Sequence, residues 1–174
     1  MRLLKLPPLH NHLVRLIFQL ILTNIQLEFS MMNWPIELFV DTSFLIALAN
    51  SSDVNHQQAL TLQLQLSQQK VHRITSEYVL FELGDGLSRL RFRAIAEKMI
   101  ALIRRDKLFE IVPASTTLLE HSLHLFRQRP DKEWGLTDCS SFIIMQQRGI
   151  QVALTADHHF EQAGFLPLLR THTL

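Results

Sequence analysis

Short apolar runs alternate along the chain with longer stretches in which apolar residues recur every three or four positions. The short runs are typical of buried strands and lie at residues 36–40, 71–75, 108–112, 152–155 and 165–169. The periodic stretches predict helices at 43–48, 56–69, 77–87, 94–105, 116–128 and 138–148, with a short helix around Phe160. Strands that alternate with helices in this way predict an α/β fold whose sheet is mainly parallel and covered by helices.

The first 33 residues do not fit this pattern. They carry three basic residues but a single acid, and the apolar run over 13–29 is interrupted by one arginine and several polar residues. A membrane span needs about 20 mostly apolar residues, so none is expected, and no secretory cleavage site is evident. The segment is an amphipathic surface helix, a disordered extension or translated sequence upstream of the true start, and Met31 and Met32 favour the last. We expect the folded domain to cover 34–174.

Composition narrows the classes of function. A chain of 174 residues fits one domain, and 17 basic against 16 acidic residues exclude a broadly polycationic surface. The single cysteine, Cys139, excludes an internal disulfide and a zinc site made of cysteines alone, and is consistent with the reducing cytoplasm. The nine histidines are scattered and lack the matched spacing of zinc ligands.

Two of the predicted strands end at a carboxylate. Asp41 follows the run 36–40, and Asp157 follows the run 152–155. Ligands bind at the carboxyl ends of strands in an open α/β sheet, and the first strand is usually central with the fourth often beside it. Asp41 and Asp157 would then face each other across one crevice. A structural role stays open for Asp41, because aspartate is also a good helix N-cap.

Two further acids would approach the same edge from helices. Asp138 is expected in the first turn of a helix capped by Thr137, and Glu82 in the middle of the helix after the second strand. The helix dipole favours a first-turn acid such as Asp138 or Glu77 whatever its function. Glu82 has no such explanation and is therefore the stronger functional candidate.

Four converging carboxylates would repel one another, so a cation is the natural compensation. Ligands that are all oxygen suit Mg²⁺ or Mn²⁺, and a metal held in this way supports phosphodiester hydrolysis best. The sequence motifs of serine hydrolases, P-loop proteins and dinucleotide-binding proteins are absent. A phosphatase using Asp41 as nucleophile would need a second aspartate two residues on, where this chain has Ser43.

Basic residues gather after the glycine pair Gly84 and Gly86. Arg89, Arg91 and Arg93 recur at every second position, just before the helix expected at 94–105. Most such residues form a solvated face, but arginines next to a catalytic crevice also contact phosphates. They are therefore candidates for RNA binding.

Four motifs contain the candidate acids. In chain order they are Val40-Asp41-Thr42-Ser43, Val79-Leu80-Phe81-Glu82-Leu83, Leu136-Thr137-Asp138-Cys139-Ser140 and Leu154-Thr155-Ala156-Asp157-His158-His159-Phe160. Together they resemble the successive motifs of PIN-domain proteins, in particular those of the VapC-like toxins. The resemblance implies a three-layer α/β/α fold with a five-stranded parallel sheet. It also implies a Mg²⁺- or Mn²⁺-dependent endoribonuclease, the toxin of a type II toxin–antitoxin pair, with RNA as substrate, a small antitoxin as partner and a homodimer.

By position, the resemblance assigns four acids to the catalytic and metal-binding set: Asp41, Glu82, Asp138 and Asp157. Asp41 and Asp138 would be the chief metal ligands, and the other two would bind the metal directly or through water. Ser43 and Thr155 match polar residues that support such sites. The alternative is a non-catalytic PIN-fold module that binds nucleic acid or protein. Loss of one acid would favour that alternative, but all four are present.

Overall fold

The computed structural model describes residues 34–170, within which a compact unit begins at Pro35. The sequence-based expectations for residues 1–33 lie outside the described residues. No helix in the described part of the chain is long and apolar enough to cross a membrane.

In chain order the elements are β1 (Glu37–Val40), α2 (Thr42–Ala49), α3 (His56–Gln68), β2 (His72–Ser76), α4 (Glu77–Gly86), α5 (Leu90–Arg105), β3 (Phe109–Val112), α6 (Thr116–Gln128), α7 (Leu136–Arg148), β4 (Val152–Leu154), α8 (His158–Gln162) and β5 (Leu166–Pro167).

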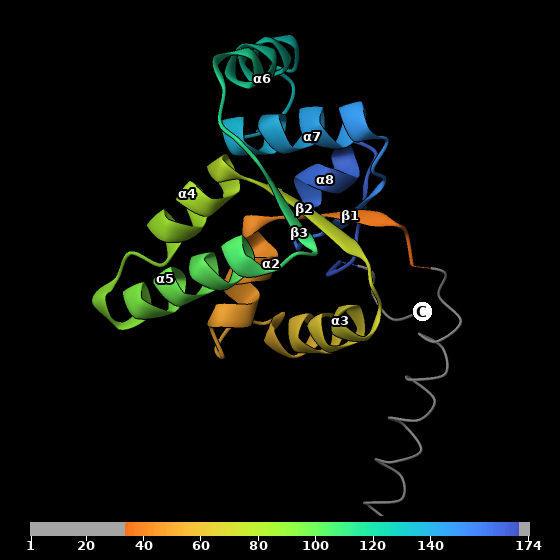
Figure 1. The fold of residues 1–174 in the computed structure, drawn as a ribbon. Coiled ribbons are helices and arrows are strands. Elements are labelled where there is room, and N and C mark those ends of the chain that lie inside the picture. The colour runs from red at the N-terminus through yellow and green to blue at the C-terminus, as the bar shows by residue number, and fades with distance from the viewer. Residues whose placement is uncertain (1–33, 171–174) are drawn as a thin grey trace, which may run out of the picture. The chain divides into compact units, whose positions relative to one another are not determined.

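The strands form one parallel sheet in the order β3-β2-β1-β4-β5. Figure 1 shows α7 and α8 on one side of this sheet and α3 and α5 on the other. The predicted three-layer α/β/α fold with a five-stranded parallel sheet is confirmed. The first strand is central and the fourth lies beside it, as expected for a sheet whose winding reverses at that point.

Several element bounds differ from the prediction by one or two residues, and those of α5 and β5 differ most. α5 begins at Leu90 rather than at residue 94, because Leu90 is exposed and Phe92 only half-buried, so the first turn adds no residue to the buried stripe from which the helix was predicted. β5 covers only Leu166–Pro167 of the expected run 165–169. The missing N–H of Pro167 breaks no hydrogen bond to β4, because the N–H groups of Leu166 and Leu168 on either side of it donate to the carbonyls of Gln151 and Ala153.

Aromatic rings fill the side of the sheet that faces α7 and α8. Phe142 in α7 contacts Trp134 and Phe160 edge to face, with ring centroids 5.0 Å apart in both pairs. Phe142 also lies 5.7 Å from Phe165, and Phe160 continues the cluster to Phe39 in β1 at 6.2 Å. Phe39, Phe142 and Phe160 are fully buried. This aromatic cluster fixes α7 and α8 against the sheet, and with them the residues at the start of each helix.

We expect Phe142→Ala to lower the free energy of unfolding by about 3–5 kcal/mol, because it removes the ring that links the aromatic cluster. Urea denaturation of the full chain measures this change. Phe126→Ala on α6, where the ring is 47% exposed, is the matched control and should change the free energy by less than about 1 kcal/mol. Equal effects of the two substitutions would show that the cluster does not stabilise the fold.

Candidate active site

The carboxyl ends of β1 and β4 share one edge of the sheet. Val40 pairs with Leu154, and the backbone N–H of Asp41 donates to the carbonyl of Leu154 at 3.1 Å. Asp41 and Asp157, which follow these strands, therefore leave the sheet at the same edge, as the sequence predicted. Each also caps the helix that follows it, so the structural role left open for Asp41 is real and coexists with its place at this edge.

Asp41 is buried and is held through one of its two carboxylate oxygens. Its Oδ2 accepts hydrogen bonds from the Ser43 N–H at 3.1 Å, the Ser43 hydroxyl at 2.7 Å and the Thr155 hydroxyl at 2.8 Å. The Ser43 hydroxyl in turn accepts from the N–H of Ala156 at 2.9 Å. The Thr155 hydroxyl accepts from the N–H of Asp157 at 3.0 Å. The N–H of Thr42 also stabilises the charged carboxylate, but the three donors from Ser43 and Thr155 converge on Oδ2, so among the described residues Oδ1 keeps acceptor capacity for a ligand.

Glu82 reaches the same edge from α4. The buried hydroxyl of Thr42, next to Asp41 in the chain, donates to Glu82 Oε2 at 2.6 Å. Partial burial raises the pKa of Glu82, and the charges of Asp41, Asp138 and Asp157 raise it further, against the lowering effect of the Thr42 hydrogen bond. The four predicted acids thus lie close enough to act on one another electrostatically. Thr42 is a contact that the sequence analysis missed, although its place beside Asp41 was a usable signal.

Asp138 is fixed by the loop that precedes α7. Its Oδ2 accepts from the N–H of Gly135 at 2.8 Å, and its side chain is 15% exposed. Gly135 is the N-cap of α7, so the prediction of Thr137 as the cap was wrong. The cap residue needs no side chain here, because Asp138 reaches back from the first turn and satisfies its N–H.

His159 is a site residue that the sequence analysis did not single out. Its Nδ1 lies 3.1 Å from Asp138 Oδ2 and 3.4 Å from Asp157 Oδ1, and its side chain is 15% exposed. His158 is half exposed, and its Nδ1 also lies 3.4 Å from Asp157 Oδ1. Ligand atoms of Asp157 and the two histidines lie within 4.8 Å of one another, close enough to share a cation. Two histidines directly after a strand-end aspartate were the signal in the sequence.

Burial makes negative charge unfavourable at this edge. It raises the pKa of Asp41 above the ordinary value of 3.8, against the lowering effect of hydrogen bonds from Ser43 and Thr155. Burial also raises the pKa of Asp138. The charges of Asp157 and Asp41 raise it further, against the lowering effect of the hydrogen bond from the Gly135 N–H. A divalent cation would compensate these charges, and carboxylate oxygens are the ligands that Mg²⁺ and Mn²⁺ prefer. The residues present therefore fit such an ion.

Cys139 lies next to Asp138 but is not a nucleophile. Its side chain is fully buried, and burial together with the charge of Asp138 raises the pKa of the thiol to about 11. A thiol with so high a pKa is protonated at neutral pH and unreactive. Cys139 is therefore a packing residue.

The three candidate RNA-binding arginines do not form a single patch. Arg89 is the N-cap of α5, and Arg91 and Arg93 lie in its first turn. Residues two apart on a helix do not share a face, so the side chains of Arg91 and Arg93 diverge, whereas Arg89 and Arg93 are four apart and lie nearer one face. All three are exposed, and Arg91 lies with its guanidinium 4.5 Å from the ring centre of Phe92. Among the described residues, no ion pair links them to the four acids.

Comparison with protein families identifies this fold. The family model of the PIN domain matches residues 38–166, which extend from β1 to β5. The chain belongs to the PIN-domain family. All four acids at the edge of the sheet lie inside the matched range of this PIN domain.

Similar proteins place the chain among the VapC toxins within the PIN-domain family. It is 33% identical over 129 residues to the 23S rRNA-specific endonuclease VapC20 of Mycobacterium tuberculosis, a match that covers 74% of this chain and 95% of VapC20. The crystal structure of VapC20, described as a sarcin-ricin loop cleaving toxin, matches with a TM-score of 0.67 and 29% identity over 74% of this chain and 96% of that one. The resemblance of this PIN domain to VapC-like toxin ribonucleases is confirmed.

A more distant structure agrees on the fold of the PIN domain. VapBC2 from Rickettsia felis, solved with a DNA fragment from its promoter, matches with a TM-score of 0.53 over 75% of this chain and 96% of that one. Its sequence identity is 16%, so this likeness shows the fold alone.

We expect Asp41→Asn to leave the metal-free protein at least as stable as the wild type at neutral pH. The asparagine oxygen can accept the three hydrogen bonds that Oδ2 accepts, and the buried charge is removed. Because the pKa of Asp41 is raised in the folded state, its ionisation lowers stability as the pH rises from about 3.8 through the raised value.

The stability difference between Asp41→Asn and wild type should therefore grow in favour of the variant over this range and then level off. Denaturant melts of both proteins in EDTA, from pH 3 to pH 8, measure it. A variant that is less stable than wild type at every pH would mean that the Asp41 charge stabilises the fold.

Proposed function

We propose that this PIN-domain chain is a metal-dependent endoribonuclease that uses Mg²⁺ or Mn²⁺ and acts in the cytoplasm as the toxin of a type II toxin–antitoxin pair. One observation carries the proposal: Asp41 and Asp138 are each hydrogen-bonded through Oδ2, which leaves Oδ1 of both for a cation. Capping alone does not account for it, because a cap requires one acceptor and Asp41 accepts two hydroxyl donors besides.

The residues at the edge of the sheet would have different roles in metal binding. Asp41 and Asp138 would hold the cation, and Glu82 and Asp157 would bind it directly or through water. When bound, the metal would activate a water molecule and stabilise the leaving oxygen in phosphodiester hydrolysis. Ser43 and Thr155 would support the site by fixing the carboxylate of Asp41, and Thr42 would fix that of Glu82 in the same way. Short hydrogen bonds of this kind hold ligands near their working geometry before the ion arrives.

The substrate class follows from the relatives. VapC20 is named as specific for 23S rRNA, and its structure is described as that of a sarcin-ricin loop cleaving toxin. We propose that a structured loop of ribosomal RNA is the substrate of this chain. Arg89, Arg91 and Arg93 are exposed and would contact phosphates of this RNA.

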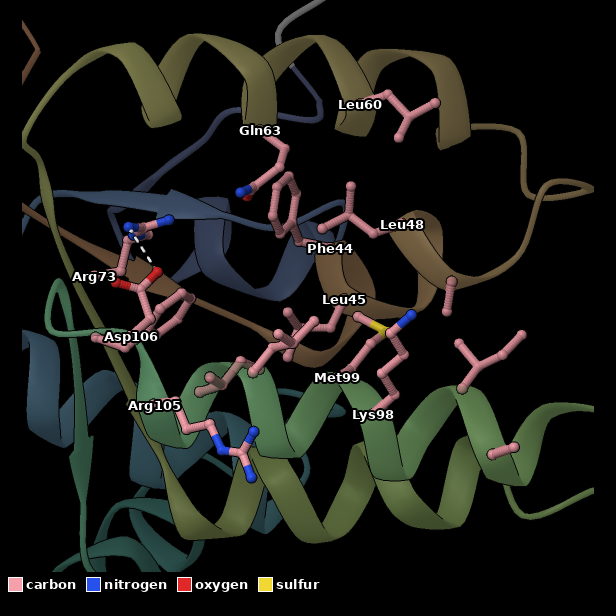
Figure 2. A pocket seen from close by; sticks show the side chains of 16 residues that line it. Phe44, Leu45, Leu48, Leu60, Gln63, Arg73, Lys98, Met99, Arg105 and Asp106 are labelled. Atoms are coloured by element: carbon pink, nitrogen blue, oxygen red, sulfur yellow. Dashed lines mark hydrogen bonds and ion pairs between the residues drawn. The ribbon is translucent and has the colours of Figure 1, made fainter.

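A small antitoxin is the proposed partner, and a groove on the far side of the sheet from the aromatic cluster fits one. The groove encloses about 960 Å³ between α2, α3 and α5. Figure 2 shows Phe44, Leu48 and Met99 between these helices, with the ion pair of Arg73 and Asp106 at one end. An amphipathic helix of a partner would bury its apolar face there.

A homodimer is the second proposed assembly. Phe81 on α4 is 71% exposed and Phe126 on α6 is 47% exposed. Exposed aromatic side chains of this size often mark a protein interface, and a second copy of the chain would cover them.

The alternative function is a PIN-fold module that binds nucleic acid or protein without cleaving. The enzyme is favoured, because a binding module has no need of neighbouring carboxylates whose pKa values are raised, by burial in all three and also by mutual charge in Glu82 and Asp138.

We expect the full chain to cleave a 23S rRNA fragment in Mg²⁺ or Mn²⁺ and not in EDTA. Asp138→Asn should lower the rate by roughly 100-fold or more, because the metal contributes several kcal/mol to the transition state. Gel analysis of labelled RNA measures the rate. Glu120→Gln, an exposed acid on α6, is the control and should cut like the wild type. Cleavage that persists in EDTA, or an Asp138→Asn variant as active as the wild type, would refute the metal-dependent mechanism.

We expect Leu102→Glu to prevent co-purification of a small protein encoded next to this chain, since Leu102 lines the groove and a charge there cannot be buried. Leu64→Glu is a matched control on α3: Leu64 is 60% exposed, Leu102 is 57% exposed, and only Leu102 lines the groove. Pull-down of a tagged chain expressed with its genomic neighbour measures the effect. Equal binding by both variants would place the partner elsewhere.

A further inference from the structure

The imidazole of His159 lies between two of the four acids. Its Nδ1 is 3.1 Å from Asp138 Oδ2, within hydrogen-bonding distance, and 3.4 Å from Asp157 Oδ1. A carboxylate can only accept, so in this contact Nδ1 carries the hydrogen and donates it to Asp138. The side chain of His159 is 15% exposed, which places this contact inside the site rather than on its rim.

We propose that His159 is a positioning residue for Asp138, which it turns so that Oδ1 faces the cation. The proposal rests on the proposed function, because it assigns a role toward the metal of that same site. Asp138 Oδ2 accepts from two directions, the N–H of Gly135 at 2.8 Å and Nδ1 of His159. One donor leaves a carboxylate free to rotate about its Cβ–Cγ bond, and two donors on one oxygen fix the plane of the group.

The same design occurs at Asp41. There the Ser43 and Thr155 hydroxyls converge on Oδ2, and Oδ1 is the oxygen that remains. The two proposed chief ligands are therefore oriented alike, each by a donor from its own helix start and a donor from the segment after β4. Thr155 supplies the second donor for Asp41, and His159 supplies it for Asp138.

The backbone holds His159 in place independently of its ring. Its N–H donates to Oδ1 of Asp157, the N-cap of α8, at 2.8 Å. The next residue, Phe160, is fully buried and lies in the aromatic cluster against Phe39 and Phe142. The Cα of His159 is thus anchored on both sides, so its ring is presented to Asp138 before any ion binds.

Substitutions at residue 159 test the role through metal affinity. His159→Ala removes the donor. His159→Asn keeps an N–H donor on the atom bonded to Cγ, where Nδ1 stands, whereas His159→Gln moves its donor one bond further out. His121→Ala on α6, an exposed histidine, is the control. Thermal melts of each variant in EDTA establish that it is folded.

Isothermal titration with Mg²⁺ and with Mn²⁺ gives the decisive numbers. We expect the dissociation constant to rise 10- to 100-fold in His159→Ala and His159→Gln, the range for residues that orient a ligand. It should stay within about threefold of wild type in His159→Asn and be unchanged in His121→Ala. Loss of affinity that the asparagine restores supports the positioning role.

Three results would overturn it. If His159→Ala binds metal with the same affinity as the wild type, His159 does not position Asp138. The proposed function would then still stand, because the wild type binds metal. If pulsed EPR of bound Mn²⁺ shows a nitrogen coupling that His159→Ala abolishes, His159 is a ligand and not a positioning residue. If the wild type binds neither metal, this inference and the proposed metal-dependent function both fail.

Discussion

Repulsion among carboxylates that the fold holds together is the constraint on which this site depends. Asp41 and Asp157 meet because β1 and β4 are parallel neighbours, and Asp138 and Glu82 join them from α7 and α4. Burial raises the pKa values of Asp41, Glu82 and Asp138, and the charges of neighbouring acids raise those of Glu82 and Asp138 further, so the metal-free site is unfavourable by itself. The rest of the domain supplies the stability that keeps it assembled.

Packing of the aromatic cluster on one side of the sheet supplies part of this stability. The aromatic cluster of Phe39, Phe142 and Phe160 joins β1, α7 and α8, which carry three of the four acids at or next to their ends. Deep burial of these rings contributes several kcal/mol per side chain, enough to offset a local electrostatic penalty. The ends of β1, α7 and α8 are therefore held in place around carboxylates that repel one another, as a preorganised metal site would require.

The fold was largely predictable from the sequence, and the site only in part. Strand-end aspartates such as Asp41 and Asp157 were predictable, because parallel strands place their carboxyl ends at one edge and the apolar runs located the strands. His159 and Thr42 could have been suspected from their places near Asp157 and Asp41, but their contacts with Asp138 and Glu82 were not predictable, because the direction of a side chain after a strand depends on the helix packed behind it. The start of α5 was missed since Leu90 is 88% exposed and leaves no periodic signal. Resemblance to PIN domains supplied the roles of the acids, which periodicity does not reveal.

We propose that one cation binds to both Asp41 and Asp138 through the oxygens that their hydrogen bonds leave available. An anomalous difference map from crystals of the chain soaked in Mn²⁺ would locate this cation directly. We expect a peak in contact with the carboxylates of both Asp41 and Asp138. A peak bound by Asp157, His158 and His159 without these two, or no peak at saturating Mn²⁺, would contradict it.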